Sequence, residues 1–249
     1  ELDVYLPEIK MGIEYNGAYA HSEARRDTGY HIKKVKHFNE KGIRVVQIWS
    51  DDWIYNKEVV KSFLNNLLGQ SKDRIGARQT TYGDVSIEDY RKFLDNHHLL
   101  GLGKGATVKV GLYHDEKLVA VCGFDKVDDS WNLVRFSADG VNGAFSKIVS
   151  NFRKEHQGTI YTFADMEVSD RINNVYFRNG FVEVENCVDK PDYKYYNPRT
   201  KKREHKFNWR KSRFDSLGIS TEGKTEEFLA FDYGLIRCWD SGKVKYELK

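Results

Sequence analysis

Two acidic residues near the start of the chain have the types and the spacing that could do chemistry. Asp3 and Glu14 lie in two short apolar segments, 2–6 and 11–15, which a proline-containing turn separates. This pattern predicts a β-hairpin or two adjacent strands, on which the two carboxylates can face each other near one end. Converging carboxylates are ligands that a hard divalent cation prefers, and such a cation lowers the pKa of a bound water. The sequence therefore predicts a Mg²⁺ or Mn²⁺ site at this hairpin.

Histidine and lysine side chains follow this hairpin closely. His21 comes next in the chain, and His31 and Lys34 are three residues apart, so they share one face of a helix predicted over 30–41. A His or Lys beside a metal-bound water can deprotonate the nucleophile or protonate the leaving oxygen. Each residue alone has an ordinary explanation, a turn carboxylate for Asp3 and an exposed helix face for His31 and Lys34. The set is more specific than any member.

The motifs that contain these residues resemble a known family. They are Glu-Leu-Asp at 1–3, Ile-Glu-Tyr-Asn-Gly at 13–17, His21, Tyr-His-x-x-Lys at 30–34 and Gly-Ile-Arg at 42–44 ahead of Asp-Asp-Trp at 51–53. This series resembles the phage-encoded homing endonucleases of the very-short-patch-repair (Vsr-like) type, in the PD-(D/E)XK superfamily. The resemblance implies a restriction-endonuclease-like fold and a Mg-dependent deoxyribonuclease that hydrolyses double-stranded DNA in the cytoplasm of a bacterial host.

The resemblance also implies which residues would form the metal site. Asp3 would be the metal carboxylate and Glu14 the second acidic ligand, with Asn16 completing the site. Asn16 stands where the superfamily usually has Lys, which leaves the identity of the polarising cation open. Lys34 and His31 are the candidates to replace it.

The remaining predicted roles concern the scissile phosphate and its neighbours. His21 would activate the attacking water, and His31 and Lys34 would stabilise the scissile phosphate. Arg25 and Arg26, in the loop between these residues, could clamp flanking phosphates. The predicted catalytic set is Asp3, Glu14, His21, His31 and Lys34.

The middle of the chain has a different pattern. Strands come first and then alternate with helices, which indicates a mixed sheet. The predicted elements are a helix over 86–96, strands over 108–114, 117–124 and 131–136, a helix over 144–156, and strands over 159–164 and 181–186. This order, together with the Tyr-Phe-x-Asn-Gly-Phe motif at 176–181, resembles an N-acetyltransferase (GNAT)-like fold.

An acyl-CoA site in such a fold would need a glycine-rich turn that offers backbone N–H groups at a helix N-terminus. The segment Gly-Val-Asn-Gly-Ala at 140–144 matches this requirement only in part. A strand-to-helix turn with two permissive glycines explains it better than a cofactor site does. The sequence therefore predicts a scaffold or DNA-reading domain here, without a bound cofactor.

A basic segment follows near the end of the chain. Residues 190–213 contain ten Lys and Arg against two acidic residues, a net charge of +8, whereas the whole chain carries only +3. Tyrosine, phenylalanine and tryptophan are interleaved with these cations, which suits phosphate contacts with some base stacking. An exposed charged hairpin is the alternative. The predicted DNA contacts are Arg25, Arg26, Lys201, Lys202, Arg203, Lys206, Arg210, Lys211 and Arg213.

The length and composition agree with an α/β protein of several parts. The 249 residues are predicted to form a restriction-endonuclease-like domain (1–69), a GNAT-like α+β domain (70–189) and a basic DNA-binding extension (190–249). Three distant cysteines argue against a disulfide framework and for a reducing cytosol, and no apolar run is long enough to span a membrane. Two alternatives to the nuclease stay open: an acyl-CoA-dependent N-acetyltransferase and a DNA-binding protein without catalysis. The oligomeric state and the target site are not readable from the sequence.

Overall fold

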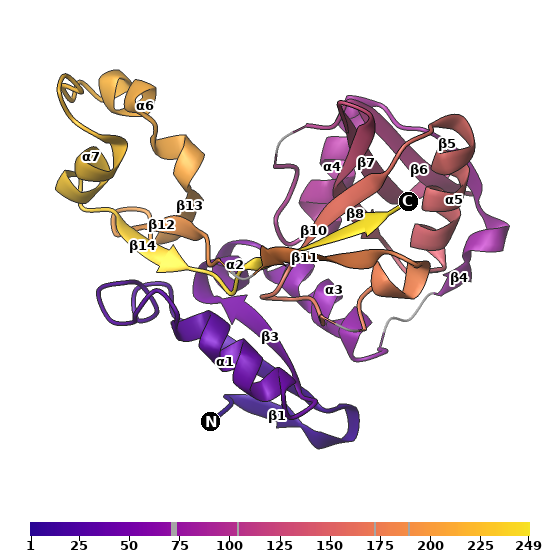
Figure 1. The fold of residues 1–249 in the computed structure, drawn as a ribbon, viewed down its shortest axis with the longest axis horizontal. Coiled ribbons are helices and arrows are strands. Elements are labelled where there is room, and N and C mark those ends of the chain that lie inside the picture. The colour runs from indigo at the N-terminus through magenta and orange to yellow at the C-terminus, as the bar shows by residue number, and fades with distance from the viewer. Residues whose placement is uncertain (71–73, 104, 172, 189) are drawn as a thin grey trace. The chain divides into compact units, whose positions relative to one another are not determined.

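The computed structural model describes residues 1–249 except 71–73, 104, 172 and 189 (Figure 1). The chain divides into two compact units. Unit 1 contains residues 1–55, 165–171 and 188–244, and unit 2 contains residues 56–164, 172–187 and 245–249. This division differs from the three consecutive domains that the sequence predicts. The first and third predicted domains, 1–69 and 190–249, both contribute most of their residues to unit 1.

Unit 1 begins with a three-stranded sheet in the order β1-β2-β3. β1 (Val4–Leu6) and β2 (Met11–Asn16) form the predicted antiparallel hairpin around the short helix η1 (Pro7–Ile9), and β3 (Arg44–Trp49) runs parallel to β2. Because parallel strands need a crossover, α1 (Tyr30–Asn39) connects β2 to β3. α2 (Ser50–Tyr55) follows β3 directly. A restriction-endonuclease-like domain over residues 1–69 is not shown, since residues 56–69 belong to unit 2.

The rest of unit 1 includes a small C-terminal lobe, residues 193–239. Its sheet has the order β13-β12-β14, with antiparallel neighbours, and two short helices follow β13 (Figure 1). The buried core of the lobe is Tyr195, Trp209, Phe214, Leu229, Ala230 and Leu235. Its elements are β12 (Tyr193–Asn197), β13 (Lys202–His205), η4 (Lys206–Trp209), α6 (Lys211–Ser216), α7 (Glu226–Asp232) and β14 (Ile236–Trp239).

Unit 2 is built on a seven-stranded mixed sheet in the order β11-β15-β10-β8-β7-β6-β5. Neighbours from β5 to β8 are antiparallel, whereas β10 runs parallel to β8 with α5 as the crossover (Figure 1). The strands are β5 (Thr81–Asp84), β6 (Val108–His114), β7 (Lys117–Val127), β8 (Ser130–Ala138), β10 (Ile160–Asp165), β11 (Val182–Val188) and β15 (Lys243–Leu248). The other elements are α3 (Lys57–Leu67), β4 (Ile75–Gly76), η2 (Ala77–Gln79), α4 (Ile87–His97), β9 (Val141–Asn142), α5 (Ala144–Glu155) and η3 (Phe177–Asn179).

The helices of unit 2 pack against opposite faces of β7, an interior strand of the sheet. Gly123 faces α4 so closely that a Cβ atom there would lie 2.1 Å from the hydroxyl oxygen of Tyr90, and only glycine fits. The next residue, Phe124, stacks on Phe152 of α5 with ring centroids 3.7 Å apart. Since neighbouring residues of a strand point to opposite faces, α4 and α5 cover the two sides of the sheet. The mixed α/β class that the sequence predicts is confirmed.

Among the described residues, no helix combines the length and the apolar character that crossing a membrane requires.

Candidate functional site

The two carboxylates of the N-terminal hairpin lie beside each other. The backbone N–H of Asp3 donates to Glu14 Oε1 (3.2 Å), and Asp3 Oδ2 accepts the backbone N–H of Tyr15 (2.7 Å). Glu14 is only 3% exposed, and its other carboxylate oxygen forms an ion pair with Lys34 of α1. The structure therefore brings three of the predicted site residues together, but with the charge of Glu14 already neutralised by the chain itself.

The prediction of a Mg²⁺ or Mn²⁺ site is wrong. Asn16, the third predicted ligand, donates its side-chain amide to Gln47 Oε1 (2.9 Å), and Gln47 in turn donates to the hydroxyl of Ser241. Throughout the described part of the chain, no group of three or more His, Cys, Asp or Glu side chains is arranged to hold a metal ion. The carboxylate of Glu14, the second predicted acidic ligand, is paired with Lys34 instead.

The two predicted catalytic histidines pack against each other in the same region. The rings of His21 and His31 lie 5.2 Å apart, and the His31 ring lies 5.1 Å from that of Trp49. Burial lowers the pKa of His31 to about 3, and burial followed by the nearby Arg26 lowers the pKa of His21. Nε2 of His31 and Nδ1 of His21 have no hydrogen-bond partner among the described residues. The low pKa of His31 means that its ring is neutral at physiological pH.

Arg203 is buried, which corrects its predicted role as a DNA contact. Its Nε donates to Asp51 Oδ1 (2.8 Å) and its Nη2 to Asp52 Oδ2 (2.6 Å), while its backbone N–H donates to Asp51 Oδ2 (2.9 Å). The guanidinium also lies over the ring of Trp49, 4.1 Å from its centroid. With a side chain only 3% exposed, Arg203 cannot reach a phosphate. The pairing tethers β13 of the C-terminal lobe to α2.

A further buried acid, Glu167, is absent from the predicted set. Its Oε1 accepts the indole N–H of Trp49 (2.8 Å), and its main-chain oxygen accepts the N–H of Gln47 (2.7 Å). Burial, followed by the nearby Asp165, raises the pKa of Glu167 to about 8. No local motif marks this residue in the sequence, because its environment comes from segments far away in the chain.

Glu167 should make the stability of the protein depend on pH. Its pKa is about 8 when folded and 4.5 ordinarily, so between these values the folded state keeps a proton that the unfolded state has lost. The free energy of unfolding should therefore fall as pH rises through this range, by at most ~1.4 kcal/mol per pH unit. The substitution Glu167→Gln keeps the acceptor for Trp49 and should reduce this slope. Urea unfolding at a series of pH values measures it, and equal slopes in both proteins would contradict the assignment.

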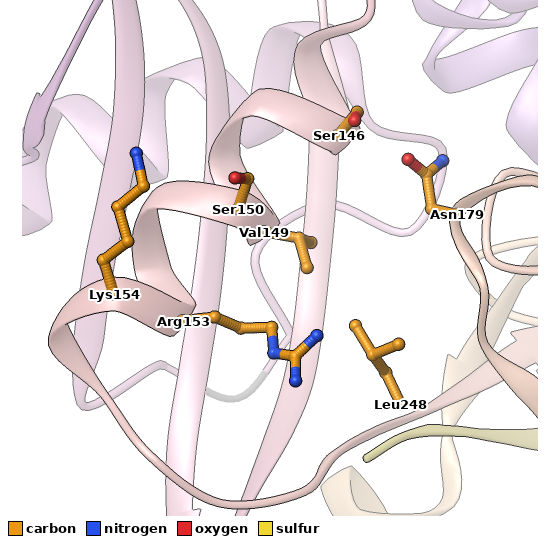
Figure 2. Close-up of a pocket in the computed structure, with 7 residues that line it drawn as sticks. All are labelled: Ser146, Val149, Ser150, Arg153, Lys154, Asn179 and Leu248. Atoms are coloured by element: carbon orange, nitrogen blue, oxygen red, sulfur yellow. The ribbon is translucent and has the colours of Figure 1, made fainter.

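A pocket of about 420 Å³ lies beside α5 in unit 2 (Figure 2). Five of its residues come from one face of α5, at the spacing that places side chains on neighbouring turns. Arg153 donates to the main-chain oxygen of Lys249 (2.9 Å), and Lys154 donates to the side-chain oxygen of Asn151 (3.2 Å), so neither cation pairs with an Asp or Glu side chain among the described residues. The α5 pocket is lined by Ser146, Val149, Ser150, Arg153, Lys154, Asn179 and Leu248.

Two cations, two hydroxyls and a carboxamide give this pocket the donors that a phosphorylated ligand requires. Figure 2 shows the Arg153 side chain extending from α5 toward Leu248, with Asn179 facing the helix from another segment. No motif in the sequence predicted this pocket. The sequence does place Ser146, Ser150 and Arg153 on one face of the predicted helix, which is a sign of a polar site. The residues that complete the pocket, Asn179 and Leu248, are distant in the chain and could not be assigned to it.

The glycine turn at 140–144 is a strand-to-helix connection. Gly140 and Gly143 both have positive φ (65° and 78°), and Gly143, the N-cap residue of α5, offers no side-chain hydrogen bond to the helix. β9 within the turn pairs in parallel with β4. Lys147, in the first turn of α5, donates to the main-chain oxygen of Ala77 (2.8 Å) and to that of Thr80. The turn is thus joined to the segment that precedes β5.

No protein-family model and no curated protein sequence matches the chain. Similar solved structures include the ribosomal-protein-S18-alanine N-acetyltransferase from Escherichia coli, at 12% identity and a TM-score of 0.39, covering 68% of this chain and 92% of the other. A GNAT family acetyltransferase from Elizabethkingia anophelis with acetyl-CoA bound is 11% identical, with a TM-score of 0.36 and coverages of 69% and 98%. The aminoglycoside 6′-N-acetyltransferase from Enterococcus faecium is 12% identical, with a TM-score of 0.32 and coverages of 68% and 96%.

The predicted identity is corrected by the contacts of the predicted site itself. The chain has a mixed α/β fold, and the structures named above, each of an acetyltransferase, are similar to it only at low TM-scores. The prediction of a Vsr-like PD-(D/E)XK homing endonuclease, acting as a Mg-dependent deoxyribonuclease, is wrong. The motif spacing in the first 53 residues suggested metal ligands, but spacing does not reveal which groups a side chain contacts. Of the three predicted ligands, Glu14 is paired with Lys34, and Asn16 is hydrogen-bonded to Gln47.

Proposed function

We propose that unit 2 is an acyl-CoA-dependent N-acetyltransferase module and that the α5 pocket holds the phosphorylated nucleotide end of acyl-CoA. The observation that carries the proposal is the pair of cations, Arg153 and Lys154, beside two serine hydroxyls in a pocket on the crossover helix between two parallel strands. This replaces the expectation of a scaffold without a cofactor.

The residues of the α5 pocket fit the charge of this ligand. Arg153 can present its guanidinium to a phosphate in two parallel hydrogen bonds, and Lys154 adds a second positive charge one residue along the helix. Ser146 and Ser150 supply hydroxyl donors on the same face. Val149 and Leu248 supply an apolar wall against which a base or an alkyl chain can pack. Bound acyl-CoA would supply the acetyl group as a thioester for transfer to an amine.

The double substitution Arg153→Ala, Lys154→Ala should weaken acetyl-CoA binding about tenfold or more, because charge-assisted hydrogen bonds to the phosphates are removed. Isothermal titration of the full chain with acetyl-CoA measures this change. A matched control is available on α4, where Arg91 and Lys92 are also adjacent and exposed. Arg91→Ala, Lys92→Ala removes the same charges from unit 2 and should leave the affinity unchanged.

The chemical step has its own readout. Attack of an amine on the thioester forms a C–N bond, breaks the C–S bond and releases CoA with a free thiol, which a thiol reagent detects in the presence of a panel of amines. Equal loss of affinity in both double variants would contradict a specific role of the α5 pocket. A wild-type chain that neither binds acetyl-CoA nor releases thiol would refute the proposed function.

A further inference from the structure

The segment from β13 to α6, residues 201–213, exposes cations without acidic partners. Two cations of this segment do form ion pairs. Arg203 pairs with Asp51 and Asp52, and Lys206 pairs with Asp192 (2.5 Å). The other five cations form no ion pair within the described part of the chain, and all are exposed. These five residues are Lys201, Lys202, Arg210, Lys211 and Arg213. A cluster of like charges without counter-charges attracts a polyanion.

One aromatic ring stands among these cations in an unusual position. Phe207 is 60% exposed, although the neighbouring Trp209 is only 3% exposed. The guanidinium of Arg210 lies over the Phe207 ring, 4.5 Å from its centroid, and the His205 ring lies 4.9 Å away. An exposed aromatic ring beside an arginine presents both the stacking surface and the charge that a nucleotide requires.

The backbone that carries Phe207 is held in place from both sides. The N–H of Phe207 donates to His205 Nδ1 (3.2 Å), and the indole N–H of Trp209 donates to Glu204 Oε2 (3.1 Å). Trp209 also belongs to the buried core of the lobe. The ring of Phe207 is therefore exposed on a fixed support, which reduces the entropy cost when a ligand stacks on it.

A second group of exposed cations lies within the same unit. Arg25 extends over the ring of Tyr19 (5.7 Å to its centroid), and Tyr19 in turn lies 6.1 Å from Tyr196 of β12. Arg26 lies over the ring of Tyr30 (4.7 Å). These cation–aromatic pairs repeat the chemistry of Phe207 and Arg210, and the predicted roles of Arg25 and Arg26 as phosphate contacts stay proposals.

From these observations we infer that the C-terminal lobe binds single-stranded nucleic acid, with Phe207 stacking on an unpaired base and Arg210, Lys211 and Arg213 contacting phosphates. The motifs of the sequence predict double-stranded DNA as the partner instead. In a duplex the faces of the bases are covered by their neighbours, so a ring fixed on the surface of the protein can stack only on a base that is free. This binding activity goes beyond the proposed acetyl transfer and requires no acyl-CoA.

The test uses the full chain and fluorescence anisotropy with a labelled oligothymidine and a duplex of equal length. The wild-type chain should prefer the single strand, and Phe207→Ala should weaken single-strand binding about 5- to 150-fold, the range expected for one stacked base. Phe228 provides the matched control, since it is 50% exposed and belongs to α7 of the same lobe. Phe228→Ala should bind like the wild type.

The charges have a separate readout in the dependence of affinity on salt. Removing one cation that binds a phosphate should reduce the slope of log K against log salt by about 0.7 for a single strand. Arg210→Ala, Lys211→Ala should therefore flatten the slope, while Arg91→Ala, Lys92→Ala in unit 2 should not. Tighter binding to the duplex, equal weakening in Phe207→Ala and Phe228→Ala, or no binding of the wild type at low salt would overturn the inference. None of these outcomes bears on acetyl-CoA binding, so the two proposals fail independently.

Discussion

Replacing Arg203 with alanine should destabilise unit 1 by about 3–5 kcal/mol, the loss expected when one partner of a buried ion pair is removed. Asp51 and Asp52 would both be deprived of their guanidinium donors, and the side chain of Asp51 is only 7% exposed. Water cannot replace the missing partner at a buried carboxylate without a rearrangement of the lobe. Urea unfolding of the full chain, followed by tryptophan fluorescence, gives the change in the free energy of unfolding.

Lys202→Ala is the matched control for this prediction. Lys202 precedes Arg203 on β13 and is exposed, with its amino group over the ring of Tyr55. We expect it to change stability by less than ~0.5 kcal/mol, as surface substitutions usually do. Adding Asp51→Asn and Asp52→Asn to Arg203→Ala should restore part of the stability, because neutral amides cost less to bury unpaired. If Arg203→Ala behaves like Lys202→Ala, the ion cluster does not stabilise the unit.

Replacing Phe152 with alanine should destabilise unit 2 by about 3–5 kcal/mol, the usual range for removing a buried aromatic side chain. Phe152 is fully buried on α5, stacked on Phe124 and edge-on to Trp131 with centroids 5.2 Å apart. The cavity left between α5 and the sheet would also loosen the helix that carries the α5 pocket. Phe163→Ala on β10 is the control, since Phe163 is 49% exposed and its removal should cost little. Equal effects of the two substitutions, measured by denaturant unfolding, would contradict this account of the core.

The local pattern predicts most of unit 2 well. The helix predicted over 144–156 is α5 (Ala144–Glu155), and the turn predicted between the strands at 108–114 and 117–124 contains Asp115 and Glu116, both with positive φ. Apolar residues recur every two positions along a strand and about every 3.6 positions along a helix because of the backbone geometry. These patterns therefore predict helices and strands without knowledge of the tertiary structure. Element boundaries are predicted less well: the helix predicted over 30–41 is α1 (Tyr30–Asn39), and the strand predicted over 181–186 is β11 (Val182–Val188).

The predicted site shows the limit of spacing as evidence. The facing positions of Asp3 and Glu14 follow from a hairpin, and the structure places them side by side. The partner of Glu14 follows from the packing of α1 across the sheet, which brings in Lys34. Motif spacing reports which side chains share an element, whereas the partner of a buried charge depends on which elements pack together.

The sequence by itself determined most elements of unit 2, the mixed α/β class and the concentration of positive charge at 190–213. Only the tertiary structure decided which of those charges are available: Arg203 is buried against Asp51, 152 positions earlier in the chain, while Arg210 stays exposed beside Phe207. It also decided that β15, from the end of the chain, lies between β10 and β11 in the sheet of unit 2. The physical reason is that secondary structure depends on neighbours in sequence, whereas burial, pairing and pocket shape depend on contacts between distant segments.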